Sequence, residues 1–222
     1  MSLSRMQMNE REANSGIEDI LTLTELKFLL TLVNYEDQNE AEKKYRSLLR
    51  RYKGGAPDLD KHFTDSYDCY NRKLLLQEEK FTLLMLIFPP RKGNKVHDHG
   101  SSSCVFKVLK GKLFERQYHK PRGEQKTLVR KGQITYRSKD GDLNVSSATN
   151  TLHSVRNLSR RKTAVSLVLY YPPLTECHIY DNSGNAFVRQ PMFGKAVPTV
   201  HDLHRLDGEN DDDAEEVEDH EL

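Results

Sequence analysis

The sequence predicts a mainly β domain, built as a sandwich or barrel of short strands with helices packed against its outside. Two observations lead to this fold class. Apolar residues in the first quarter of the chain repeat at helical spacing, whereas those beyond residue 80 fall in short β-rich runs bounded by turns. Helices confined to one end of such a chain are expected to cover the strands from outside. The 222 residues fit one domain with helical additions.

The helical pattern covers residues 17–53 and predicts two amphipathic helices. Its apolar positions are Ile17, Ile20, Leu23, Leu26, Leu29, Leu30, Val33, Ala41, Tyr45, Leu48 and Leu49. Two glycines and a proline within residues 53–57 interrupt the pattern, and residues 58–70 are expected to add a short helix. The helices are therefore expected within residues 17–70.

Short β-rich runs separated by turns make up the rest of the domain. The runs cover residues 80–88, 95–99, 104–109, 112–118, 126–130, 143–147, 152–157, 163–170 and 178–180. The turns carry Gly93, Gly100, Gly111, Gly123, Gly132, Gly141 and Gly184. A single domain is expected over residues 17–205.

Both ends of the chain have compositions typical of disorder. Residues 1–16 are polar, and residues 206–222 are mostly Asp and Glu with few apolar side chains to bury. We expect the acidic tail to be a solvating segment, the alternative being a segment that recruits a basic partner. Neither end is expected to carry the activity.

Charge and composition exclude several classes of partner. The formal net charge is +1, from 34 basic and 33 acidic residues, so no overall field favours nucleic acid or an anionic membrane. The longest apolar stretch, residues 81–88, is far shorter than the roughly 20 residues of a membrane span. Three widely spaced cysteines fit a reducing compartment. We expect a cytoplasmic protein, monomeric by default, that binds a small neutral or zwitterionic molecule.

Three histidines are the candidate metal ligands. His97 and His99 lie at the end of a short predicted strand, where residues two apart point to the same face. By itself this pair is weak support, because nine histidines in the chain would produce the spacing by chance about as often as not. His153 begins a distant β-rich run with Asn157 four residues later. The remaining histidines lack a comparable arrangement and are expected to be ordinary: His62, His119, His178, His201, His204 and His220.

The spacing around these histidines resembles the paired signature of the cupin superfamily. Gly93, the two histidines, Cys104 and Gly111 follow the first half of that signature, and His153 with Asn157 follows the second. The resemblance implies a jelly-roll β-barrel in which distant strands bring the histidines to one metal. Cys104 stands where the signature normally has Glu. Three neutral imidazoles suit iron, zinc, copper or nickel, and ligand type alone does not choose among them.

Further segments make the resemblance more specific. They are HDHGSSSC at residues 97–104, AVSLVLYYPP at residues 164–173, Cys177 with His178, and Lys80 with Phe81. Together they resemble the cysteine dioxygenase type I family, in order from about residue 22 to residue 197. The resemblance implies that ferrous iron binds the thiolate and amine of L-cysteine together with dioxygen. The sulfur is then oxidised to cysteine sulfinic acid, a step of cysteine catabolism and taurine biosynthesis.

The same resemblance assigns roles to residues around the metal. Cys104 and Tyr170 stand where the family forms a thioether between a cysteine sulfur and a tyrosine ring carbon. Arg72 matches the arginine that binds the substrate carboxylate, a task suited to its planar fork of donors, and Tyr70 is expected to help shape that pocket. A cis peptide bond is expected before Pro172, the first of two prolines.

One position departs from the family pattern. Ser166, Val168 and Tyr170 alternate along one predicted strand and should share the side that faces the metal. The family usually has histidine where Val168 stands, and that histidine hydrogen-bonds the tyrosine hydroxyl. Its loss is expected to change the efficiency or the substrate range rather than the iron chemistry.

Two alternatives to an enzyme for cysteine stay open at this point. The first is a related dioxygenase for another small thiol, such as a mercapto acid or cysteamine, and Arg72 bears on it because an arginine favours a substrate with a carboxylate. The second is a non-catalytic cupin that binds a metal or a ligand.

Overall fold

The computed structural model describes residues 20–54, 69–120, 127–138, 143–146, 152–181 and 183–189. Within these residues the protein is mainly β, with two helices before the first strand, as the sequence predicts. The helices are α2 (Leu23–Thr31) and α3 (Gln38–Arg51). The strands are β1 (Asn71–Gln77), β2 (Thr82–Phe88), β3 (Val96–His97), β4 (Ser103–Lys110), β5 (Lys112–His119), β6 (Val129–Arg137), β7 (Leu143–Ser146), β8 (Leu152–Arg156), β9 (Ala164–Tyr171), β10 (Cys177–Tyr180) and β11 (Ala186–Arg189).

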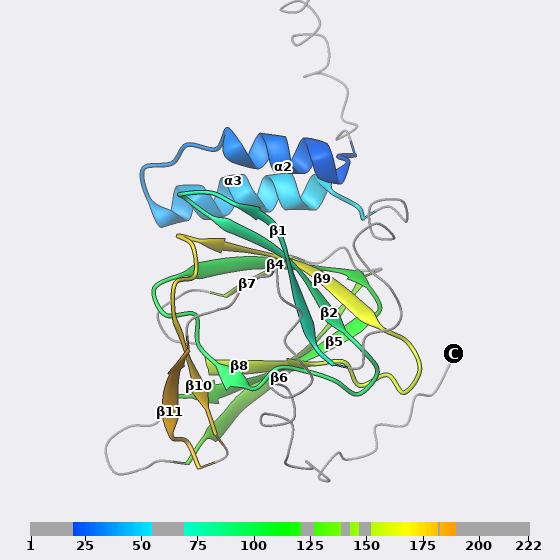
Figure 1. Ribbon diagram of the computed structural model, residues 1–222, viewed down its shortest axis with the longest axis vertical. Helices are drawn as coiled ribbons and strands as arrows, with labels where there is room; N and C mark the ends of the chain where they lie inside the picture. The colour runs from blue at the N-terminus through cyan, green and yellow to red at the C-terminus, as the bar shows by residue number, and fades with distance from the viewer. Residues whose placement is uncertain are drawn as a thin grey trace, which may run out of the picture.

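The strands form two sheets that face each other (Figure 1). One sheet has the order β1-β2-β9-β4-β7, and the other has the order β11-β10-β3-β8-β5-β6. Strands far apart in sequence are neighbours in both sheets, such as β4 with β9 and β3 with β8. Hydrogen bonding among the described strands leaves two separate sheets and does not close them into one barrel.

Both helices begin where the sequence supplies a capping side chain. Thr22 accepts a hydrogen bond from the backbone N–H of Glu25, whose carboxylate accepts one from the N–H of Thr22 in return. Asp37 caps α3 by accepting from the N–H of Glu40. Among the described residues, no helix is long and apolar enough to span a membrane.

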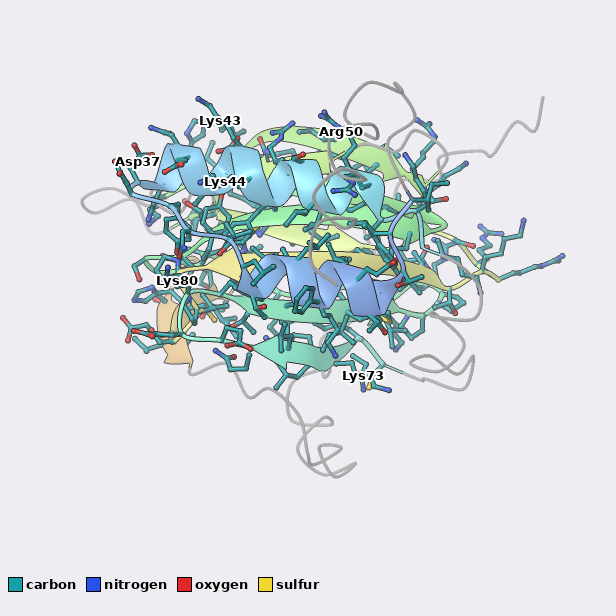
Figure 2. The ribbon with its side chains drawn as sticks, turned by 90° about the horizontal axis from the view of Figure 1, so that it is seen from above. Asp37, Lys43, Lys44, Arg50, Lys73 and Lys80 are labelled. Atoms are coloured by element: carbon teal, nitrogen blue, oxygen red, sulfur yellow. The ribbon has the colours of Figure 1, made fainter. Side chains whose placement is uncertain are left out.

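The helices cover the outer face of the five-stranded sheet (Figure 1). Viewed from above, α2 and α3 lie side by side over the sheet, with the exposed Lys43 and Arg50 on the side of α3 away from α2 (Figure 2). Beneath them, Tyr45 packs against Phe81 and Tyr171, with ring centroids 5.8 and 5.1 Å away. The helices therefore form the layer outside the strands that the sequence predicts.

A buried lysine also ties α3 to the sheet. Lys107 of β4 is 3% exposed, and its Nζ donates hydrogen bonds to the carbonyls of Leu49, Arg50 and Tyr52. These carbonyls belong to the end of α3, where the last helical C=O groups lack partners within the helix. The ammonium thus satisfies the helix end and fixes its place on the sheet.

Alternation along the central strands divides the core in two. In β2, Leu83, Met85 and Ile87 belong to the cluster under the helices, whereas Leu84 and Leu86 belong to the cluster between the sheets. Because both faces of β2 are covered, all of its residues are buried and its sequence is a nearly continuous apolar run. The second cluster surrounds the candidate site.

Four details of the strand prediction are wrong. The run predicted at residues 126–130 overlaps β6 only at its end, because residues 127 and 128 lie outside any strand and β6 continues to Arg137. Strands β1 and β11 were not predicted, since NRKLLLQ and AFVR show no clear alternation of apolar and polar residues. Gly132 lies inside β6 rather than in a turn, beside a register shift between β5 and β6. A glycine within a strand is typical of such irregular pairing.

Several predictions lie outside the described residues. They concern the disordered segments 1–16 and 206–222, most of the short helix at 58–70, and the end of the domain up to residue 205.

Candidate metal centre

The structure brings together the three histidines that the sequence singles out. His97 lies in β3, His99 follows this strand, and His153 lies in β8 directly opposite His97. One ligand atom from each of the three side chains lies within 4.8 Å of the others. The Nε2 atoms of His99 and His153 are 3.0 Å apart. Such a group can hold a metal ion.

Hydrogen bonds orient two of these imidazoles. His97 Nδ1 lies 2.9 Å from the carbonyl oxygen of Lys95, and His153 Nδ1 lies 2.5 Å from Glu115 Oε1. A carbonyl and a carboxylate can only accept, so each Nδ1 is assigned the proton. The lone pair of each Nε2 is then available to a metal.

Two of the imidazoles, those of His97 and His99, are held in the neutral form that binds metals. Burial lowers the pKa of His97 to about 3, with a contribution from nearby His153, and lowers the pKa of His99 well below 6.5. Such rings bind a metal at neutral pH without first losing a proton. Three neutral nitrogen donors fit a divalent cation of borderline softness, including ferrous iron.

A small cavity of about 30 Å³ lies beside the histidines. Its polar lining comes from Asn94, His97, His99, Cys104, His153, Ser166 and Tyr170, and its apolar lining from Leu86, Phe88, Phe106, Leu113, Val155 and Val168. Ser166, Val168 and Tyr170 therefore do face the cavity from β9, as the alternation predicts. The cavity thus combines apolar walls with convergent polar groups, which is typical of a small-molecule site.

Cys104 and Tyr170 meet at the wall of this cavity. They are directly opposite each other in the β4–β9 ladder, and both are buried. The Tyr170 ring packs edge-on against His99, with centroids 5.2 Å apart. Burial, together with nearby Cys104, raises the pKa of Tyr170 well above 10. Its hydroxyl is therefore protonated at neutral pH.

Arg72 of β1 and Tyr70, which directly precedes this strand, lie near the cavity but are not among the residues that line it. Arg72 is directly opposite Leu86 in the β1–β2 ladder, and directly opposed residues point to the same face of a sheet. Because Leu86 lines the cavity, Arg72 shares the cavity face. The Tyr70 ring packs against Phe88, with centroids 4.8 Å apart.

Asn94 supports Tyr70 and was missed by the sequence analysis. Its Oδ1 accepts a hydrogen bond of 2.6 Å from the N–H of Val155. A hydrogen bond with Asn94 opposes the rise that burial causes in the pKa of Tyr70.

The predicted cis bond between Tyr171 and Pro172 is confirmed.

Val168 occupies an apolar position. Leu84 and Phe106 are its direct neighbours on either side in the sheet, and Val168 is 4% exposed. The position at which the family usually has histidine is therefore flanked by apolar side chains on both neighbouring strands.

Asp98, between the candidate ligands His97 and His99, was also missed. It is 3% exposed and accepts hydrogen bonds from the N–H groups of His178 and Gly100. Burial alone would raise its pKa, but these hydrogen bonds bring the pKa below its ordinary 3.8. His178, expected to be ordinary, lies with Nδ1 3.1 Å from Asp98 Oδ2. This contact joins β10 to the segment that carries the ligands.

The carboxylate of Glu115 is a further unpredicted feature. Glu115 is 1% exposed, and Tyr136 donates a hydrogen bond of 2.6 Å to its Oε2. Burial opposes ionisation, but the hydrogen bonds from His153 and Tyr136 keep the pKa of Glu115 below its ordinary 4.5. A signal was present in the sequence, because Glu115 alternates with Leu113 and so takes an inward position.

Comparison with known proteins gives a consistent family match. The family model described as cysteine dioxygenase type I matches residues 19–183. The chain is 36% identical to cysteine dioxygenase type 1 of Rattus norvegicus over 113 residues, which cover 50% of this chain and 56% of that protein. It is 28% identical to the Danio rerio protein of the same name over 187 residues, covering 79% and 84%. The chain thus spans just over half the length of the rat relative.

Solved structures with a similar arrangement include two proteins of low identity. One is TT1209 from Thermus thermophilus, with a TM-score of 0.35, 23% identity, and coverage of 52% of this chain and 95% of that one. The other is an rmlc-like cupin protein from Desulfovibrio desulfuricans, with a TM-score of 0.35, 19% identity, and coverage of 52% and 94%.

Proposed function

Because this chain belongs to the cysteine dioxygenase type I family, we propose that it is an iron-dependent thiol dioxygenase acting on L-cysteine. The reaction adds both atoms of dioxygen to the sulfur, so that a thiol and dioxygen together give the sulfinic acid and nothing is released. We also propose a cytoplasmic setting, because the substrate is a free thiol that a reducing compartment keeps reduced.

The observation that carries the proposal is the convergence of three imidazoles at one wall of a cavity. Their residue type and orientation fit a divalent iron ion, with His97, His99 and His153 as ligands. A ferrous ion held there would supply the redox chemistry that lets dioxygen react with a thiolate. The cavity lies beside the same three histidines.

The substrate is held by the face of β1 that points into the cavity. Arg72 binds the carboxylate of cysteine through its fork of N–H donors. Tyr70 packs against Phe88 and bonds with Asn94, two residues that line the cavity, and would support this end of the pocket. The positive charge of Arg72 fixes the end of the substrate away from the sulfur, so the sulfur is directed to the histidines.

We further propose that Cys104 and Tyr170 form a thioether. The bond would join Cys104 Sγ to a ring carbon of Tyr170, with loss of the thiol hydrogen and a ring hydrogen to dioxygen as the oxidant. Direct pairing across β4 and β9 supports it, since opposed residues lie close enough for their side chains to touch. The bond would hold the phenol beside His99.

Val168 favours one second candidate, a dioxygenase for a different small thiol. Val168 lies in a row with Leu84 and Phe106, so this stretch of the wall offers a substrate apolar contact. A mercapto acid keeps the carboxylate that Arg72 would bind and lacks the amine of cysteine. Cysteamine lacks the carboxylate and makes no use of Arg72.

A turnover assay with several thiols tests the proposal. Protein loaded anaerobically with ferrous iron would receive cysteine, a mercapto acid or cysteamine, and then oxygen. We expect oxygen consumption and sulfinate formation to be highest with cysteine, and to be lost in His153→Ala. The matched control is His119→Ala, which changes an exposed histidine of β5. Protein that binds iron but oxidises none of these thiols would refute the proposed dioxygenase activity.

A further inference from the structure

A buried carboxylate connects His153 of the candidate metal centre to Tyr136 of β6, within the same six-stranded sheet. Glu115 of β5 is 1% exposed, yet both of its oxygens are engaged. Oε1 lies 2.5 Å from His153 Nδ1, and Oε2 accepts a hydrogen bond of 2.6 Å from the hydroxyl of Tyr136. Burying a charged group is costly unless it is paired and hydrogen-bonded. Such a group calls for an explanation beyond packing.

The pairing of the strands builds this chain of contacts. In the β5–β8 ladder, Glu115 lies opposite Val155, so His153 is its diagonal neighbour two residues away. In the β5–β6 ladder, Glu115 lies opposite Ile134, so Tyr136 is its diagonal neighbour on the other side. Long side chains reach across such diagonals. His153, Glu115 and Tyr136 therefore form one line across three adjacent strands.

The hydrogen bond between Glu115 and His153 fixes the tautomer and the orientation of the His153 ring toward a metal. A carboxylate that accepts from Nδ1 fixes the proton there, turns the ring and leaves the lone pair on Nε2. It also places a negative charge one hydrogen bond behind the ligand, which raises the basicity of that ligand. His97 has only a neutral carbonyl, that of Lys95, in the same position. Of His97 and His153, it is His153 whose Nδ1 is hydrogen-bonded to a carboxylate.

We propose that Glu115 is a positioning residue that acts through His153 to set the metal affinity and the reduction potential of the site. The inference rests on the metal site of the proposed function and not on its thiol chemistry. Cys104 occupies the place where the cupin signature has a carboxylate, so the ligands themselves carry no charge. Glu115 supplies one negative charge near the centre, through its hydrogen bond to His153.

Tyr136 holds the carboxylate in place. Its hydroxyl donates to Oε2, and its ring packs edge-on against Phe106 of the facing sheet, with centroids 4.9 Å apart. Phe106 in turn lines the cavity and lies opposite Val168. The orientation of Glu115 is thus fixed from both sheets.

Metal binding by the intact protein tests the proposal without turnover. Metal-free wild type and E115Q would be titrated anaerobically with cobalt(II), whose visible absorption reports both affinity and ligand geometry. Glutamine keeps the size of the side chain and removes its charge. We expect E115Q to bind cobalt about 10- to 100-fold more weakly, with shifted absorption bands. In the iron-loaded protein, the reduction potential should rise, because a nearby negative charge stabilises ferric iron.

Two further variants separate this role from a general effect on folding. E115D keeps the charge but shortens the side chain, so it should also lose affinity through the broken contact with His153. K107M removes a buried charged group of β4 that contacts α3 and not the metal ligands, so its absorption bands and affinity should match wild type. If E115Q fails to fold, E115D carries the test.

The outcomes distinguish this inference from the proposed function. Affinity, absorption bands and reduction potential that are equal in wild type, E115Q and E115D would overturn the role of Glu115, whatever the enzyme oxidises. Normal metal binding by wild type without oxidation of any thiol would overturn the proposed function and leave the role of Glu115 standing.

Discussion

Cys104 of β4 and Tyr170 of β9 lie directly opposite each other in the five-stranded sheet, with both side chains at the wall of the cavity beside the histidines. Thr82 of β2 lies opposite Tyr170 on its other side. Pairing in the ladder fixes this register, because a slip by one residue would turn one of the two side chains to the helix face. This pairing supports the proposed thioether.

The first prediction concerns this bond. Crosslinked and uncrosslinked protein should migrate as a doublet on a denaturing gel, since a covalent bridge makes the unfolded chain more compact. Cys104→Ala should reduce the doublet to one band. Cys177→Ala, which changes another buried thiol close to Tyr170, should retain both bands. A doublet that persists without Cys104 would exclude the proposed bond.

The second prediction concerns substrate binding by Arg72. Arg72→Ala should raise KM for cysteine by at least about 10-fold, because a charged hydrogen bond to the carboxylate is lost. Lys73→Ala is the matched control, since Lys73 lies opposite Met85 of the core under the helices and points to the other face. Figure 2 shows Lys73 at the edge of the molecule. An unchanged KM in Arg72→Ala would remove this residue from the substrate site.

The third prediction concerns Val168. Val168→His should raise kcat/KM for cysteine by about 10-fold, because an imidazole two residues from Tyr170 on the same face can hydrogen-bond its hydroxyl. The measurement is steady-state turnover with cysteine and a mercapto acid. Val168→Leu keeps the row apolar and should not produce this gain. Equal effects of histidine and leucine would mean that only the volume of the side chain matters.

The fourth prediction concerns acid stability. The folded pKa of Asp98 lies below its ordinary 3.8, so the unfolded chain takes up this proton first as the pH falls. The stability that Asp98 contributes is therefore complete above 3.8 and lost as the pH falls through this value toward the folded pKa. Urea unfolding of the metal-free protein at several pH values should show a shallower acid loss in Asp98→Asn. Glu78→Gln, which changes an exposed carboxylate, should follow wild type, and identical slopes in all three would contradict the assignment.

Much of the fold could be predicted because its periodicities are strong. The positions of Leu23, Leu26 and Leu30 give one face of a helix, and they are the buried residues of α2. The continuous run in β2 is apolar because both of its faces are covered. Strand β1 could not be predicted, since its sequence begins with polar and charged residues and continues with consecutive leucines. Its place is set by pairing with β2, which local sequence does not encode.

The candidate site divides in a similar way. His97, His99 and His153 could be selected because motif spacing and resemblance to a family point to them. Glu115 and Asp98 were not selected, because a lone acidic residue is usually solvated. The inward position of Glu115 follows from its alternation with Leu113, but only the tertiary fold brings each carboxylate to its partner. Tertiary contacts therefore supply the surroundings of the ligands, while the sequence supplies the ligands.

Oxidation of cysteine with isotopically heavy dioxygen is the most direct test of an iron-dependent thiol dioxygenase. Iron-loaded protein would be given cysteine and labelled dioxygen in ordinary water, and the product analysed by mass spectrometry. We expect cysteine sulfinic acid in which both sulfinate oxygens carry the label, in an amount equal to the dioxygen consumed. Sulfinate oxygens derived from water, or no oxidation of any small thiol by protein that holds iron, would contradict the proposed activity.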